Sequence, residues 1–173
     1  MKTGYLKRNS TLKSHTPLRA KSGFVKKHSS MKSSGFSRDS QPTQQFTLDR
    51  IFSEYVRRIH ADANNAVQCV TCGIYRRWND RMDAGHFIPR QHMATRYDIY
   101  NVFCQCRECN RELNGNITKF SEYITKCFGE NAVQELKERA QTIIHDFPYE
   151  EKIKEFRAKV EKLREEQDIS IQY

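Results

Sequence analysis

The stretch that decides the fold reads Cys69-Val70-Thr71-Cys72-Gly73 and continues, after an intervening segment, as Cys106-Arg107-Glu108-Cys109-Asn110. Both Cys-x-x-Cys pairs have the same spacing, and residues 73–105 lie between them. Four thiolates can surround one Zn²⁺ as a tetrahedron with Zn–S distances of about 2.3 Å, which leaves no position for water. We therefore expect a structural zinc site. Only 37% of the chain is apolar, so zinc should supply a large share of the folding free energy.

The two remaining cysteines, Cys104 and Cys127, fall outside these pairs. The N-terminus has no apolar signal segment, and the longest apolar runs are far short of the ~20 residues needed to cross a bilayer. We therefore expect a soluble, cytoplasmic protein with no membrane partner. In that compartment thiols stay reduced, and Cys104 and Cys127 are expected to be buried free thiols.

All of the excess charge lies at the N-terminus. Residues 1–45 carry ten Lys or Arg side chains and one acid, which gives 10 − 1 = +9, and this equals the net charge of the whole chain. The segment is rich in Ser, Thr, Lys and Gly and has too little apolar surface to order itself, so we expect a disordered basic arm that binds DNA. An inert solubilising tail is the alternative. The cations expected to contact phosphates are Lys7, Arg8, Lys13, Arg19, Lys26 and Lys27.

Residues 46–173 are predicted to form one α+β domain. Apolar residues at helical spacing begin at Phe46 and predict a helix to about Ala63, with Thr47 as its N-cap. Asn64 and Asn65 would end that helix. The other predicted elements are strands near residues 67–70, 76–80 and 84–88, an irregular loop over 89–97, a short helix after the second cysteine pair, and helices over 117–128, 131–144 and from Pro148 onward.

The segment between the cysteine pairs contains residues that suggest a catalytic site. It contains Asp83-Ala84-Gly85-His86-Phe87-Ile88-Pro89, then Asn101, and Asn110 follows the last cysteine directly. This order resembles the motif of HNH nucleases, whose fold is a ββα-metal core. The resemblance implies that His86 is the general base and that Asn101 braces the loop that orients it. It also implies that Asn110 binds a catalytic metal.

A narrower resemblance covers about residues 46–166. Besides the cysteine motifs and Asp83-Ala84-Gly85-His86, it includes Gly115-Asn116 and Gly129-Glu130-Asn131-Ala132-Val133. In this order the motifs resemble the NinG/Rap recombination endonucleases of lambdoid phages. The resemblance implies a nuclease for branched recombination intermediates, of the Holliday junction or D-loop type, that acts in the host cytoplasm.

The catalytic metal is expected to be Mg²⁺ or Mn²⁺, held by oxygen atoms of Asp83 and Asn110. Many HNH enzymes have the metal-binding Asp directly before the base, whereas this chain has Gly85 there. Asp83 lies three residues from His86 and would face the opposite side of a regular strand, so we expect a bulge at Gly85. Asp98 and Glu112 are the substitute carboxylates.

Three further residues are expected to contact DNA, namely Arg90, Arg96 and Asn114. Asn114 lies four residues after Asn110 and would share its helix face. Each assignment has a plainer alternative. Arg90 and Arg96 can belong to a solvated loop, His86 can be a partly buried structural histidine, and Asn110 can be an N-cap.

Two other functions fit the same residues. One is a zinc-knuckle DNA-binding module without catalysis, and the other is a homing or restriction-type HNH endonuclease. Symmetric cleavage of a four-way junction would favour a homodimer. The apolar stripe of the last helix, with Ile153, Phe156, Val160 and Leu163, can serve such an interface or pack on its own domain.

Overall fold

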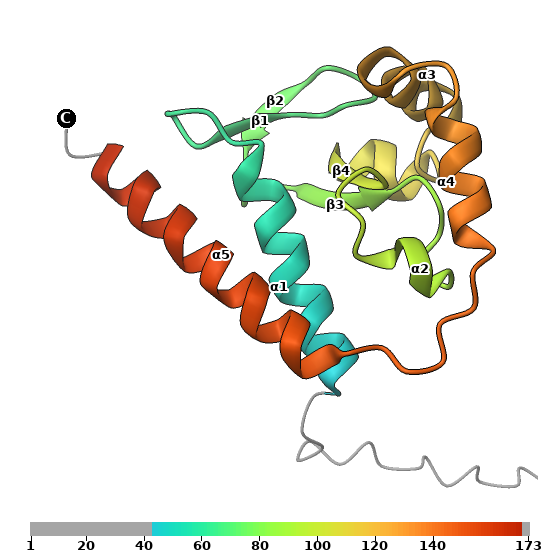
Figure 1. The fold of residues 1–173 in the computed structure, drawn as a ribbon. Coiled ribbons are helices and arrows are strands. Elements are labelled where there is room, and N and C mark those ends of the chain that lie inside the picture. Colours follow the sequence, from blue (N-terminus) through green and yellow to red (C-terminus); the bar gives the residue numbers. More distant parts are fainter. Residues whose placement is uncertain (1–42, 171–173) are drawn as a thin grey trace, which may run out of the picture. The chain divides into compact units, whose positions relative to one another are not determined.

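The computed structural model describes residues 43–170, with side chains through Gln167. It has a mixed α+β architecture, as predicted (Figure 1). The six lysines and arginines expected to contact phosphates from the N-terminal arm lie outside the described residues. The elements are α1 (Gln44–Ile59), β1 (Ala66–Gln68), β2 (Tyr75–Arg77), β3 (Met82–His86), α2 (Met93–Arg96), β4 (Val102–Cys106), the short π-helix η1 (Glu108–Glu112), α3 (Ile117–Phe128), α4 (Ala132–Ala140) and α5 (Tyr149–Ser170).

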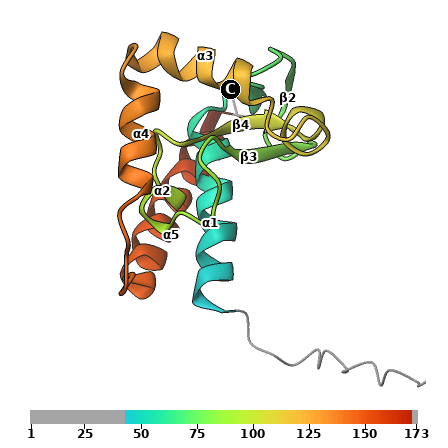
Figure 2. The same ribbon diagram turned by 90° about the vertical axis from the view of Figure 1, so that its right-hand side faces the viewer.

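Two small antiparallel sheets form the centre of the domain. Strand β1 pairs with β2, and β3 pairs with β4 in a register that sets Met82 opposite Cys106 and His86 opposite Val102. Figure 2 shows β3 and β4 running together beside α1. Ala84 and Val102 pack against the buried side chains of α1, which fixes the helix on one face of this sheet.

The long helix α5 packs along α1 (Figure 1). Phe156 of α5 is buried against Phe52 of α1, with ring centroids 5.0 Å apart in an edge-to-face arrangement. Arg164 also pairs with Glu54. The apolar stripe of the last helix therefore packs on its own domain, which was one of the two predicted uses.

A second core lies under α3 and α4. Phe120 and Ile124 of α3 and Leu136 of α4 pack against Phe87 and Phe103, so these helices cover the segment that follows β3 and the side chains of β4. A third cluster surrounds the paired cysteines and includes Val67 and Met82. None of the described helices is both long and apolar enough to span a membrane.

The predicted boundaries need several corrections. Helix α1 begins at Gln44 because the hydroxyl of Thr43, not Thr47, caps it by accepting from the Phe46 N–H. It ends at Ile59 rather than Ala63, because the Asp62 carboxylate accepts from the Asn64 and Ala66 N–H groups and holds a turn there. The loop over residues 89–97 contains the short helix α2, strand β4 was not predicted, and α4 ends at Ala140.

Candidate active site and metal centre

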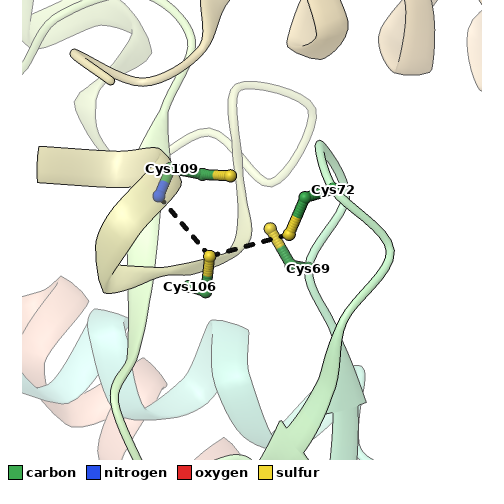
Figure 3. A group of neighbouring side chains, drawn as sticks. All are labelled: Cys69, Cys72, Cys106 and Cys109. Carbon is green, nitrogen blue, oxygen red and sulfur yellow. Dashed lines mark hydrogen bonds between the residues drawn. The ribbon is translucent and has the colours of Figure 1, made fainter. Parts of the chain in front are cut away.

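The four paired cysteines meet at one point. Cys69 and Cys72 lie in the turn after β1, while Cys106 ends β4 and Cys109 lies in η1 (Figure 3). Their sulfur atoms all lie within 4.8 Å of one another, and the Cys72 and Cys106 sulfurs are 3.7 Å apart. A tetrahedral zinc–thiolate site has sulfur–sulfur separations of about 3.8 Å. The cluster can therefore hold a metal such as zinc.

The surroundings of these sulfurs favour a bound cation. Burial opposes ionisation of Cys69, but hydrogen bonds, chiefly from the Thr71 hydroxyl 3.2 Å away, lower the pKa of this thiol to about 6. Burial raises the pKa of Cys106, and the neighbouring thiols add to this. Several thiolates so close together repel one another unless a cation lies between them. Zn²⁺ fits this all-sulfur donor set.

The two other cysteines lie in different environments. Cys104 is fully buried in β4, as predicted, and burial raises the pKa of its thiol to about 12. Cys127 is exposed on the last turn of α3, so the prediction of a buried thiol is wrong there. A residue's place on a helix face depends on what packs against the helix, and that information is tertiary.

A cavity of about 470 Å³ lies along β3. It brings Asp83, His86 and Asn110 together, although Asn110 comes from η1. The other residues that line it are Ser53, Ala84, Arg90 and Arg111. No sequence motif pointed to Ser53 or Arg111. Arg111 follows Asn110 directly, but no sequence signal shows that α1 brings Ser53 beside β3.

The expected bulge at Gly85 is absent. Pairing of β3 with β4 is continuous from Met82 to His86, so Asp83 and His86 belong to opposite faces of the strand. Both residues nevertheless line the same cavity.

Gly85 has a different role. A Cβ atom at this position would collide with the buried side chain of Gln105, lying 2.7 Å from its Cδ and even closer to its Oε1. Gln105 is itself held in place, because its amide donates to the Gly115 carbonyl at 2.7 Å. The close approach of Gln105 therefore accounts for glycine where many HNH motifs have aspartate.

This contact predicts the effect of Gly85→Ala. Overpacking of a tight core typically costs about 1–3 kcal/mol, so we expect a loss of that size in the free energy of unfolding of the zinc-loaded protein, measured with urea. The double variant Gly85→Ala/Gln105→Ala should lose less than the sum of the two single changes. A Gly85→Ala protein as stable as the parent would refute the steric explanation.

Each ring nitrogen of His86 has a hydrogen-bond partner. Its Nε2 lies 3.0 Å from the Arg96 carbonyl oxygen, and since a carbonyl only accepts, Nε2 carries the proton of the neutral ring. Arg90 Nε lies 3.5 Å from Nδ1. Burial and the nearby Arg90 lower the pKa of His86 to about 4. His86 is therefore neutral near pH 7, and its Nδ1 lone pair accepts only the long hydrogen bond from Arg90.

Asn101 is fully buried and ties the loop after β3 together. Its side-chain oxygen accepts from the Ile88 N–H at 2.7 Å, and its amide group donates to the carbonyls of Ile88 and Thr95. The Asn101 carbonyl also accepts from the Phe87 N–H. Asn101 thus fixes the conformation of the residues that follow His86 through its side chain and its backbone carbonyl.

Asp83 has two partners on η1. The Asn110 amide donates to one carboxylate oxygen at 3.0 Å, and Arg111 bonds both oxygens, at 2.7 and 3.0 Å. Burial works against ionisation of Asp83, yet the hydrogen bonds from Arg111 and Asn110 hold the pKa of Asp83 below its usual value. The Arg111 side chain is 59% exposed, and an exposed ion pair contributes little free energy. Arg111 could therefore exchange Asp83 for another anion at little cost in free energy.

Asn110 lies inside η1, so the alternative prediction that Asn110 is a helix N-cap is wrong. Asn114 follows the end of η1 with a φ of 49°, and it does not share the helix face of Asn110 as expected. Neither substitute carboxylate lines the cavity, and Asp98 pairs with Arg139 instead.

The two loop arginines differ. Arg90 is exposed and lines the cavity. Arg96 is largely covered, and its Nε donates to Asp49 at 2.9 Å while a second nitrogen bonds the other carboxylate oxygen. Arg96 holds the loop to α1 in this way, and its expected contact with a DNA phosphate stays a prediction.

Comparison with known proteins agrees with part of the resemblance seen in the sequence. The family model described as the bacteriophage lambda NinG protein matches residues 2–166. No curated protein and no solved structure matches the chain significantly. Since the family model spans nearly the whole chain and includes both cysteine pairs, the chain belongs to the family of the bacteriophage lambda NinG protein.

Proposed function

We propose that this protein is a metal-dependent endonuclease of the HNH type that hydrolyses phosphodiester bonds in branched DNA recombination intermediates, such as a Holliday junction or a D-loop. The observation that carries the proposal is the single cavity lined by Asp83, His86 and Asn110. Phosphodiester hydrolysis needs a base within reach of water and a cation beside the phosphate oxygens. These three side chains offer both kinds of group.

His86 is the proposed general base. The Nε2–H of the neutral imidazole is held by the Arg96 carbonyl, so Nδ1 is the atom that would take a proton from water. Water would first replace the long hydrogen bond that Arg90 Nε donates to Nδ1. The proton received at Nδ1 is a positive charge in a partly buried site, and the Arg96 carbonyl is oriented to stabilise it. Asn101 has the supporting role of fixing the loop that carries Arg96.

Asp83 and Asn110 would hold Mg²⁺ or Mn²⁺ through a carboxylate and an amide oxygen, the hard ligands that these ions prefer. When bound, the ion would neutralise charge on the phosphate oxygens. Asp83 already has a low pKa and is ionised at neutral pH. Arg111 now pairs with Asp83, so we propose that it turns to a phosphate oxygen when the metal and DNA bind.

Zinc at the four cysteines has a structural role in this proposal. Cys106 ends β4, beside β3, and Cys109 lies next to Asn110. Zinc would therefore hold η1 in register with the strand that carries Asp83 and His86. The N-terminal arm would bind phosphates through Lys7, Arg8, Lys13, Arg19, Lys26 and Lys27 without reading sequence. A homodimer would present two such cavities to a junction.

The test is cleavage of three labelled substrates, a four-way junction, a D-loop and a linear duplex, by the zinc-loaded full chain. We expect the branched substrates to be cut when Mg²⁺ is added and to stay intact when it is withheld. Withholding Mg²⁺ is preferable to a chelator, which would also remove the zinc. Binding without cleavage under every metal condition would favour the non-catalytic zinc-knuckle module, and sequence-specific cutting of the duplex would favour a homing or restriction-type enzyme.

A further inference from the structure

A second hollow adjoins the cavity and shares Ser53 and Arg90 with it. It measures about 630 Å³ and runs along α1, where residues between Phe46 and Arg57 line it. Arg157 of α5 lines it as well. Because Ser53 and Arg90 line both spaces, the hollow leads from α5 along α1 to the cavity of His86.

The charge of this hollow is positive. Its lining includes the arginines Arg50, Arg57, Arg90 and Arg157, and the acids Asp49 and Glu54. Both acids are bonded to arginines outside the lining. Asp49 is paired with Arg96, and Glu54 accepts from Arg58 at 2.8 Å and from Arg164 at 3.0 Å. The two acids are therefore shared with three arginines outside the lining, so arginine charge exceeds acidic charge around the hollow.

Three of these arginines face solvent. Arg50, Arg90 and Arg157 are exposed, whereas Arg57 is partly buried and donates to backbone carbonyls, including those of Ser53 and Trp78. In the part of the chain that the structure describes, neither Arg50 nor Arg157 forms an ion pair. A guanidinium in this state can bind a phosphate through two parallel hydrogen bonds without giving up an internal partner.

We propose that this hollow, named here the α1–α5 groove and defined by Arg50, Arg90 and Arg157, binds the DNA backbone and leads one strand into the cavity of His86. The inference rests on the proposed function and adds a binding surface to it. Charge complementarity identifies the occupant as a chain of phosphates. The basic arm precedes α1 in the sequence, and Phe46 and Thr47 near the start of α1 line the groove.

Arg50 and Arg157 allow a clean test, because Arg90 also contacts His86 and would disturb it. Binding of a labelled four-way junction to the zinc-loaded full chain is measured by fluorescence anisotropy over a range of salt, with Ca²⁺ in place of Mg²⁺. Removal of one arginine that binds a phosphate should reduce the slope of log affinity against log salt by about 0.9. The double variant Arg50→Ala/Arg157→Ala should therefore show a slope shallower by about 1.8 and an affinity lower by roughly tenfold or more.

Two controls accompany this variant. Arg77→Ala/Lys137→Ala removes the same charge from exposed positions on β2 and α4 that do not line the groove, and it should keep nearly the parent slope. Arg50→Lys/Arg157→Lys keeps both charges and should restore most of the slope, a result that a misfolded groove would not give.

The outcomes separate this inference from the proposed function. If the groove variant binds with the parent affinity and slope, or if the Arg77 and Lys137 control loses as much, the groove is not the DNA path. In that case a parent that still cuts junctions with Mg²⁺ leaves the nuclease proposal intact. If the parent neither binds nor cuts junction DNA, the proposed function and the groove both fail.

Discussion

Replacing Cys106 with serine should release the zinc and unfold the domain. The Cys106 sulfur lies 3.7 Å from that of Cys72 and accepts from the Cys109 N–H, so it joins the two halves of the cluster. Structural zinc contributes about 10–16 kcal/mol of binding free energy in zinc-finger peptides, which equals or exceeds the roughly 5–15 kcal/mol net stability of a domain. Zinc content by mass spectrometry and thermal unfolding measure the two effects together.

The remaining cysteines provide the controls. Cys104 is buried with its sulfur 3.7 Å from the Val56 carbonyl oxygen, to which a serine hydroxyl can also donate, so Cys104→Ser should cost about 1 kcal/mol. Cys127 is exposed, and Cys127→Ser should change stability by less than about 0.5 kcal/mol. Loss of zinc from Cys104→Ser with retention in Cys106→Ser would show that the ligands are assigned incorrectly.

Local signals in the sequence predicted the features that depend on local chemistry. The identical spacing of the two cysteine pairs predicted the cluster, because a Cys-x-x-Cys spacing lets both sulfurs of a pair reach one metal ion. Helix α3 has the predicted bounds, 117–128, and Gly129 follows it with a φ of 96°, a conformation that other residues rarely adopt. Pro148 precedes the first residue of α5, as expected of a helix start.

Long-range packing explains what the sequence did not predict. All five residues of β4 are buried, so the strand lacks the alternation that marks a half-exposed strand. A rule for one isolated strand places Asp83 and His86 on opposite faces, yet both line one cavity with Asn110 of η1. The pairing of Arg96 with Asp49 joins the loop to α1 across a long stretch of sequence, and no local pattern predicts it.

The His86→Ala variant should slow cleavage of a junction by roughly 10²- to 10⁴-fold, the usual contribution of a general base. The substitution leaves Asp83 and Asn110 in place, so junction affinity and zinc content should stay at the parent values. His145→Ala is a matched control, because His145 is exposed and does not line the cavity. It should cleave at the parent rate in single-turnover assays.

Asn110→Ala should differ from His86→Ala in its metal dependence. It removes a proposed metal ligand, so the half-saturating Mg²⁺ concentration should rise, and high Mg²⁺ or Mn²⁺ should recover part of the rate. His86→Ala should not recover in this way, because its defect is the missing proton acceptor. Identical metal titrations for the two variants would argue against separate roles for a base and a metal ligand.

The central claim, that the cavity of Asp83, His86 and Asn110 is the active site of a nuclease, is tested most directly by anomalous diffraction at the manganese edge. Crystals of the zinc-loaded His86→Ala chain with junction DNA and Mn²⁺ would capture the substrate, because this variant should cut the junction far more slowly than the parent. The account predicts a manganese peak within coordination distance of the Asp83 carboxylate and the Asn110 side-chain oxygen, with a DNA phosphate beside it. A manganese ion bound elsewhere, or a cavity that no phosphate enters, would contradict the account.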